Sequence, residues 1–219
     1  MTVAGYFSLT FIMVAVFLFI FSRATQSKKW IFLFIGGFAI WSIYLFLLGQ
    51  FDVLRVMTLP PRMPMLVILP AFLLIIFTVG SSHFGKLLER IPRHQIIYAQ
   101  SFRVAVELLI FQSFVEGLLP ERVTFDGINF DILVGATALI IGFLAQKNMI
   151  GKKIILGWNI LGLGILSVTV YSFLSYFYFM PHDPSVNVLA IMQLPFMYLP
   201  GFLMPLAVFF HMISIKQNL

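Results

Sequence analysis

Seven long apolar runs, separated by short polar gaps, dominate this sequence of 219 residues. They cover residues 3–22, 30–50, 64–80, 99–119, 131–148, 154–179 and 187–214. A helix needs about 20 residues to cross the hydrocarbon core of a bilayer, and the runs are close to that length. Their Phe, Leu and Ile residues are contiguous, whereas strands of an outer-membrane barrel alternate apolar and polar positions. The pattern predicts an all-α, polytopic integral membrane protein with seven transmembrane helices.

Composition supports this fold class. Hydrophobic residues make up 61% of the chain, against about 45–50% in a soluble domain. The gaps leave no room for a soluble domain, so residues 1–219 are predicted to form a single seven-helix transmembrane domain. The net charge of +6 comes from basic residues at the ends of the runs, where lipid headgroups lie. We expect membrane lipids as partners and no nucleic acid, while the oligomeric state stays open.

The basic residues indicate the orientation of the helices. Three lie in the even-numbered gaps, namely Arg55, Arg62 and Arg122. Ten lie in the odd-numbered gaps and the C-terminal tail: Arg23, Lys28, Lys29, Lys86, Arg90, Arg93, Lys147, Lys152, Lys153 and Lys216. Because cytoplasmic loops carry the excess of Lys and Arg, the N-terminus is predicted outside and the C-terminus in the cytoplasm. The first run lacks a basic start, as expected of a retained helix. We expect a multi-pass protein of a bacterial inner (plasma) membrane.

Three charged residues, Arg103, Glu107 and Glu116, lie inside the fourth run, although charged residues are only 10% of the chain. An ionisable group at membrane depth costs about 2.5–3.5 kcal/mol on insertion scales and needs a partner. Arg103 and Glu107 are four residues apart on one helical face, so they are predicted to pair. Glu116 lies nine residues beyond Glu107, on another face and near the outer surface.

Polar residues of two later runs are predicted to lie at a depth similar to that of Arg103 and Glu107. Asn159 lies near the inner start of the sixth run, and His211 near the inner end of the seventh. We therefore predict that Arg103, Glu107, Asn159 and His211 converge on a cytoplasmic-side cavity and handle a ligand or a proton. The alternative is structural, with an ion pair that locks the fourth helix to its neighbours and an interfacial histidine.

The outer half of the molecule has its own candidate residues. The last run carries Pro195, Pro200 and Pro205, and each proline removes a helical hydrogen bond and favours a kink. The loop 120–131 contains an Asp-Gly turn signal, with Asn129 or Asp131 as the N-terminal cap of the fifth helix. The sequence predicts an outer vestibule lined by Glu116, Gln193, Tyr198 and Asp131. A turn, a cap and a kink without any ligand would explain the same residues.

Several families of membrane proteins are excluded. Retinal-binding proteins need a lysine deep in the last helix, whereas the last run here, residues 187–214, contains no lysine and Lys216 lies beyond it. A zinc site needs several converging ligands, but His83, His94, His182 and His211 are distributed over both sides of the predicted membrane. The chain also has no cysteine. We expect no metal and no cofactor.

The leading functional hypothesis is a small-molecule binding or transport protein, linked to proton movement, whose polar cavity is lined by the fourth to seventh helices. The first alternative is an intramembrane enzyme that acts on a lipid or quinone-like substrate, with Glu107 or Glu116 as general base. The second is a structural subunit of a membrane complex. The sequence indicates no catalytic residue beyond these glutamates, and it favours a protein that is not an enzyme.

Overall fold

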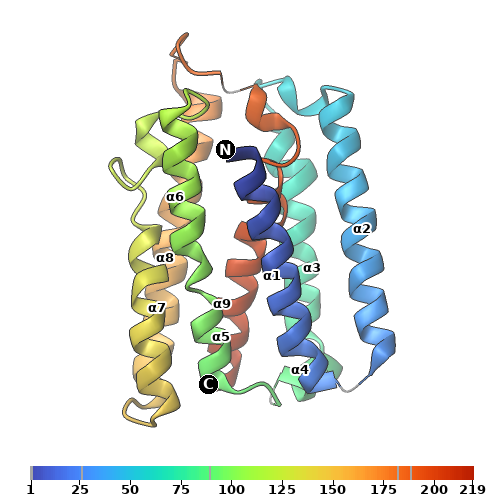
Figure 1. Ribbon diagram of the computed structural model, residues 1–219, viewed down its shortest axis with the longest axis vertical. Coiled ribbons are helices and arrows are strands. Elements are labelled where there is room, and N and C mark those ends of the chain that lie inside the picture. Colours follow the sequence, from blue (N-terminus) through green and yellow to red (C-terminus); the bar gives the residue numbers. More distant parts are fainter. Residues whose placement is uncertain (1, 26, 89, 182, 188) are drawn as a thin grey trace. The chain divides into compact units, whose positions relative to one another are not determined.

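The structure is a computed structural model that describes residues 2–25, 27–88, 90–181, 183–187 and 189–219. The prediction of an all-α chain is confirmed, because the described residues form helices, turns and loops and contain no strand (Figure 1). The chain divides into two compact units. The first comprises Val3–Ile91 and Val188–Pro205, and the second comprises Pro92–Asn187 and Leu206–Leu219, together with Thr2.

The first unit contains α1 from Val3 onward, α2, α3 and α4, and the second contains α5 to α8. The last helix, α9, belongs to the second unit from Leu206. The α-helices are α1 Thr2–Thr25, α2 Lys28–Gln50, α3 Leu69–Gly80, α4 Ser82–Leu88, α5 Arg93–Ala99, α6 Phe102–Val115, α7 Asp131–Gln146, α8 Lys152–Phe179 and α9 Met204–Asn218. Two π-helical turns, η2 Pro64–Ile68 and η5 Leu199–Leu203, lead into α3 and α9. The 3₁₀ turns are η1 Val53–Arg55, η3 Glu121–Val123 and η4 Ala190–Met192.

Within the described residues, four helical segments are long and apolar enough to cross a membrane: Thr2–Thr25, Lys28–Gln50, Lys152–Phe179 and Leu199–Asn218. The segments Pro64–Gly80 and Asp131–Gln146 are apolar but shorter. Two of the predicted runs are less regular than their composition suggests. The fourth run falls on α5 and α6, which are separated by a turn at Gln100 and Ser101. The seventh run becomes helical from Tyr198, after η4 and a series of turns.

Aromatic donors on α2 compensate for prolines near the two π-helical turns of the first unit. A proline stands four residues after Leu66 and another four residues after Gly201, so neither carbonyl can receive the usual helical N–H. The hydroxyl of Tyr44 donates to the carbonyl of Leu66 at 3.0 Å. The indole Nε1 of Trp41 donates to the carbonyl of Gly201 at 2.8 Å. The two π-helical turns thereby have their proline-freed carbonyls satisfied by side chains of a neighbouring helix.

Small residues bring α7 close to α5 and α6 in the second unit. Asp131, Gly135, Ala138 and Gly142 recur at helical spacing and are all buried, so they form one face of α7. A Cβ on Gly135 would lie 2.7 Å from the backbone nitrogen of Val104 on α6. Since this contact leaves no room for a side chain, the two backbones meet at Gly135. Asp131, one turn earlier on the same face, is therefore directed at α6 as well.

Candidate functional site

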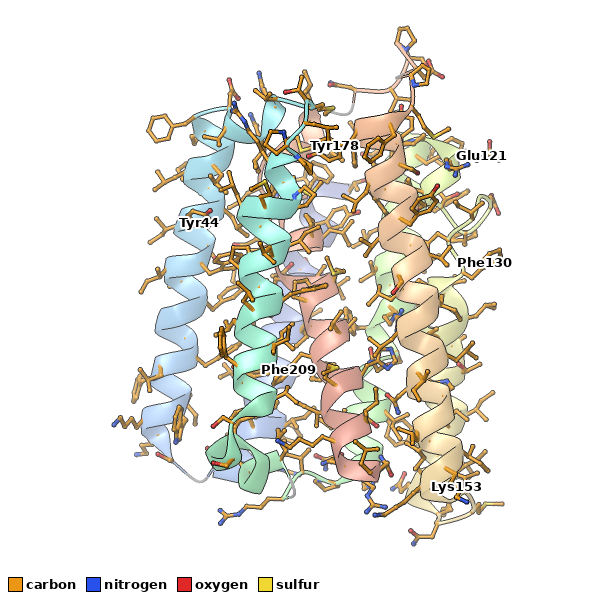
Figure 2. The ribbon with its side chains drawn as sticks, turned by 180° about the vertical axis from the view of Figure 1, so that it is seen from behind. Tyr44, Glu121, Phe130, Lys153, Tyr178 and Phe209 are labelled. Atoms are coloured by element: carbon orange, nitrogen blue, oxygen red, sulfur yellow. The ribbon has the colours of Figure 1, made fainter. Side chains whose placement is uncertain are left out.

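Eight polar side chains in the second unit form what we call the buried network: Arg103, Glu107, Asn129, Asp131, Asn159, Thr169, His211 and Ser214. Each is at most 7% exposed. They come from α6, α7, α8, α9 and the loop before α7. Figure 2 shows Lys153 and Tyr178 at opposite ends of α8, with Glu121 toward the Tyr178 end. Asn159 and Thr169 are ten residues apart on α8, so the network extends about 15 Å along this helix.

Arg103 forms a two-point ion pair with Asp131. Its Nε donates to Oδ2 of Asp131 at 2.6 Å, and its Nη2 contacts Oδ1 of the same carboxylate. The predicted pairing of Arg103 with Glu107 is therefore wrong: the partner of Arg103 is 28 residues away in sequence. The reason is the close contact at Gly135, which places Asp131 within reach of the guanidinium. The planar fork of arginine matches a carboxylate in this two-point arrangement.

The hydrogen bonds of His211 determine its tautomer. Nη1 of Arg103 lies 2.6 Å from Nε2 of His211, and a guanidinium only donates, so Nε2 accepts. On the other side of the ring, Nδ1 lies 2.8 Å from Oδ1 of Asn159. That oxygen is identified because Nδ2 of Asn159 donates to the carbonyl of Ile155 at 2.8 Å. His211 is therefore neutral, with its proton on Nδ1.

The far end of the network continues from Asn159 to α9. Nδ2 of Asn159 donates to Oγ of Ser214 at 2.9 Å. Gly162 lies one turn after Asn159 on α8, and a Cβ there would be 2.5 Å from Cε1 of His211. The ring of Trp158 lies on another side of the histidine, with 5.6 Å between ring centroids. His211 is thus held by two hydrogen bonds and by close packing.

Glu107 belongs to a second branch of the network, around Asn129. Nδ2 of Asn129 donates to Oε2 of Glu107 at 2.7 Å and to the carbonyl of Val123 at 3.0 Å. Oδ1 of Asn129 accepts from the Thr169 hydroxyl at 2.6 Å and from the Asp131 backbone N–H at 3.1 Å. Because one of these bonds goes to a carbonyl and another to an N–H, the orientation of the amide is defined by the backbone.

The loop that carries Asn129 is shaped by a glycine. The backbone N–H of Gly127 donates to the carbonyl of Thr124 at 3.0 Å, which confirms the turn predicted at Asp-Gly. A Cβ on Gly127 would lie 2.5 Å from the carbonyl oxygen of Arg122, so the turn requires glycine. The predicted cap of α7 is partly correct, because Asn129 accepts from the first N–H of the helix. Asp131 itself pairs with Arg103 instead.

The buried network has one more carboxylate than it has cations. The charges of Arg103 and Asp131 cancel within their ion pair. His211 is neutral in its tautomer. Among the residues that the structure describes, Glu107 forms no ion pair of its own; its hydrogen bond is with Asn129. Arg103 lies one helical turn away, but its donors contact Asp131 and His211. Arg103, Glu107, Asn159 and His211 do come together, as the sequence suggests, and their functional role stays a prediction.

The residues predicted for an outer vestibule occupy different settings. Asp131 is buried in the ion pair and belongs to the network. Glu116 lies at the end of α6, where it accepts from Gln112 at 3.2 Å in an exposed position. In the first unit, Tyr198 is buried and its ring stacks on that of Phe38 with 6.0 Å between centroids. Gln193, in the turns before η5, is half-buried.

Sequence reasoning left out three members of the network and one neighbour. Asn129 was predicted only as a cap residue, and neither Thr169 nor Ser214 was among the residues predicted for a site. Gln100, which donates to the carbonyl of Ala207 at 3.1 Å, is also buried. It stands three residues before Arg103 and seven before Glu107, so helical spacing would have placed it on the same face.

The expectation of no metal site remains a prediction. Within the described ranges, no group of three or more His, Cys, Asp or Glu side chains is placed to hold a metal ion. His182 lies outside the described residues, and the side chain of His83 is likewise not described. His94 lies beside Tyr98 on α5, with 6.2 Å between ring centroids, and not in the buried network.

Residues 60–217 match the family described as Domain of unknown function (DUF8737). Because this range covers most of the chain, the chain belongs to that family. The matched range contains every residue of the buried network, whereas α1 and α2 precede it. No curated protein and no solved structure matches the chain.

Proposed function

We propose that this family member is a polytopic membrane protein that binds or transports a small molecule through the buried network, in a process linked to a proton. The observation that carries this proposal is the surplus carboxylate at Glu107. A buried ion pair that serves only to lock helices together needs equal numbers of opposite charges, because an uncompensated buried charge is expensive. The extra carboxylate therefore favours a group that receives a proton or a ligand over a purely architectural pair.

The distribution of side chains in the second unit supports a membrane location. Large apolar residues on α7 and α8 point outward, and all of the following are more than 40% exposed: Leu133, Leu139, Ile140, Phe143, Ile154, Ile160, Leu161 and Val168. The charged side chains of the network point inward. A water-soluble domain shows the opposite arrangement, and continuous exposed apolar surface marks contact with a membrane or a partner. Together with the basic gaps, this arrangement supports seven spans with the N-terminus outside.

The proposed topology is testable because the chain has no native cysteine. Met149→Cys lies in the exposed turn between α7 and α8, and Ser185→Cys lies in the exposed loop after α8. In intact cells, a membrane-impermeant maleimide should label Ser185→Cys and leave Met149→Cys unlabelled until the membrane is permeabilised. Both variants are matched in exposure, so a difference reports the side of the membrane. Labelling of both cysteines in intact cells would contradict the proposed topology.

Ligand binding is best tested by thermal stability, because a compound that binds the folded state raises the melting temperature. The purified protein in detergent is heated with a panel of organic anions, amines and lipids. We expect at least one class to stabilise the wild type and to lose most of that effect in Glu107→Gln. Glu121→Gln, the same change at an exposed site on η3, is the matched control.

Two outcomes of this panel would count against the proposal. The first is that no compound stabilises the wild type. The second is that Glu107→Gln and Arg103→Ala respond to the compounds as the wild type does. The latter outcome would favour a structural subunit of a complex.

A further inference from the structure

We propose that the ion handled by the buried network is a proton, which is bound at Oε1 of Glu107, and that Asn129 is the residue that positions this carboxyl group. The inference rests on the proposed function and specifies the chemistry of the same site. Within the network, the charges of Arg103 and Asp131 cancel, and His211 is neutral. Glu107 is then the member whose protonation changes the net charge from negative to zero.

His211 is not the proton carrier in this arrangement. Its Nε2 lone pair accepts from the guanidinium of Arg103 at 2.6 Å, and its Nδ1 already carries a hydrogen that points at Asn159. A second proton on the ring would have to sit on Nε2, where it would face the positive Arg103. Two like charges in contact in a desolvated site are strongly unfavourable. The histidine is therefore a fixed acceptor that orients Arg103.

The groups around Glu107 suit a proton better than a metal cation. A hard cation needs several oxygen ligands with free lone pairs. The atom that faces Oε2 is an amide N–H donor, from Asn129. The amide oxygen of Asn129 already accepts from Thr169 and from the Asp131 backbone. The positive Arg103, one turn away on α6, would further repel a metal ion. A proton needs a single oxygen, and Oε1 supplies it.

Asn129 defines which carboxyl oxygen receives the proton. Because its Nδ2–H donates to Oε2, that oxygen is the acceptor in both protonation states, and the new O–H bond forms on Oε1. A proton delivered by water adds to an Oε1 lone pair, and its departure returns the same pair to the carboxylate. No oxidation or reduction takes place. In the ionised state, the Asn129 N–H and the nearby Arg103 stabilise the negative charge of Glu107. The neutral His211 adds no positive charge, and the negative charge of Asp131 is unfavourable for a second carboxylate nearby.

The location of the proton can be measured by infrared difference spectroscopy on the full-length protein in lipid vesicles. A buried protonated carboxyl group has a C=O stretching band that disappears when the group ionises. We expect such a band in the wild type at neutral pH and its loss at alkaline pH. The band should be missing in Glu107→Gln, which retains shape and the ability to accept from Asn129. It should persist in Glu121→Gln, the exposed control.

Asn129 is tested by the pH dependence of the same band. In Asn129→Ala the ionised carboxylate loses its amide donor, so the band should survive to higher pH than in the wild type. An equivalent change at exposed Asn187→Ala should leave the midpoint unchanged. A purely structural role of Asn129 would leave the midpoint of any folded variant unchanged. The Glu107→Gln comparison locates the proton by itself and does not require Asn129→Ala to fold.

The proposal is overturned if the band persists in Glu107→Gln, or if the wild type has no titrating buried carboxyl band. This result is separable from a failure of the proposed function. A Glu107 band in a protein that responds to no compound of the thermal panel would remove ligand binding and retain the proton site. Stabilisation by a compound without any such band would retain ligand binding and remove the proton site.

Discussion

Asp131→Asn should lower the free energy of unfolding by about 3–5 kcal/mol, which is the largest effect that we expect from a single substitution. The change retains the size of the side chain and removes its charge, so the guanidinium of Arg103 would be left buried beside a neutral amide. The cost arises because the guanidinium has lost its hydration and its donors no longer meet a carboxylate, since the remaining acid, Glu107, is bound to Asn129 instead. The measurement is denaturant unfolding of the purified protein in detergent.

Two comparisons make this result specific to the ion pair. Asp126→Asn makes the same chemical change at an exposed position of the loop before α7, and should alter stability by no more than about 0.5 kcal/mol. The double variant Asp131→Asn, Arg103→Met removes both charges and should recover part of the loss. A double variant that is no more stable than Asp131→Asn would show that the loss does not come from the unpaired arginine.

Gly162→Ala should destabilise the protein by about 1–3 kcal/mol, the usual cost of overpacking a dense interior. Its new Cβ would lie 2.5 Å from Cε1 and 2.8 Å from Nε2 of His211. The histidine cannot move aside without breaking its bonds to Arg103 and Asn159, which are 2.6 Å and 2.8 Å long. The substitution should therefore disturb the network as well as the packing, and it should reduce any ligand response in the thermal panel.

Gly164 provides the matched control on the same helix. A Cβ at Gly164 would meet no atom within 4 Å, so Gly164→Ala adds a methyl group to open space. It should be neutral or should stabilise α8 by about 0.5–1 kcal/mol through its higher helix propensity. Chemical denaturation of both variants compares the two sites directly. Equal effects at the two glycines would contradict the packing of His211 against Gly162.

The helices of this protein were predictable from the apolar runs, because a backbone in an apolar setting must satisfy its hydrogen bonds internally. The irregular segments were not. The predicted last run contains three prolines, and the helix forms only from Tyr198, after η4 and turns. Whether a proline kinks a helix or delays its start depends on which neighbours can satisfy the freed carbonyls. Here Trp41 is the donor for Gly201, from a helix 160 residues earlier in the chain.

The sequence was enough to predict several residues of the candidate site, but not which of these residues contact one another. Arg103, Glu107, Asn159 and His211 were selected because polar groups in apolar helices need one another. Local spacing then suggested that Arg103 binds Glu107, the nearest acid on its own helix. The structure pairs Arg103 with Asp131 and gives Glu107 to Asn129.

The sequence by itself therefore determined that the chain is helical and that its few buried charges lie together, because both follow from the cost of exposing polar groups to an apolar surrounding. The tertiary structure decided which charge neutralises which. Gly135 lets α7 approach α6 until Asp131 reaches Arg103. Helical periodicity describes one helix at a time, whereas an ion pair between helices depends on how closely their backbones meet.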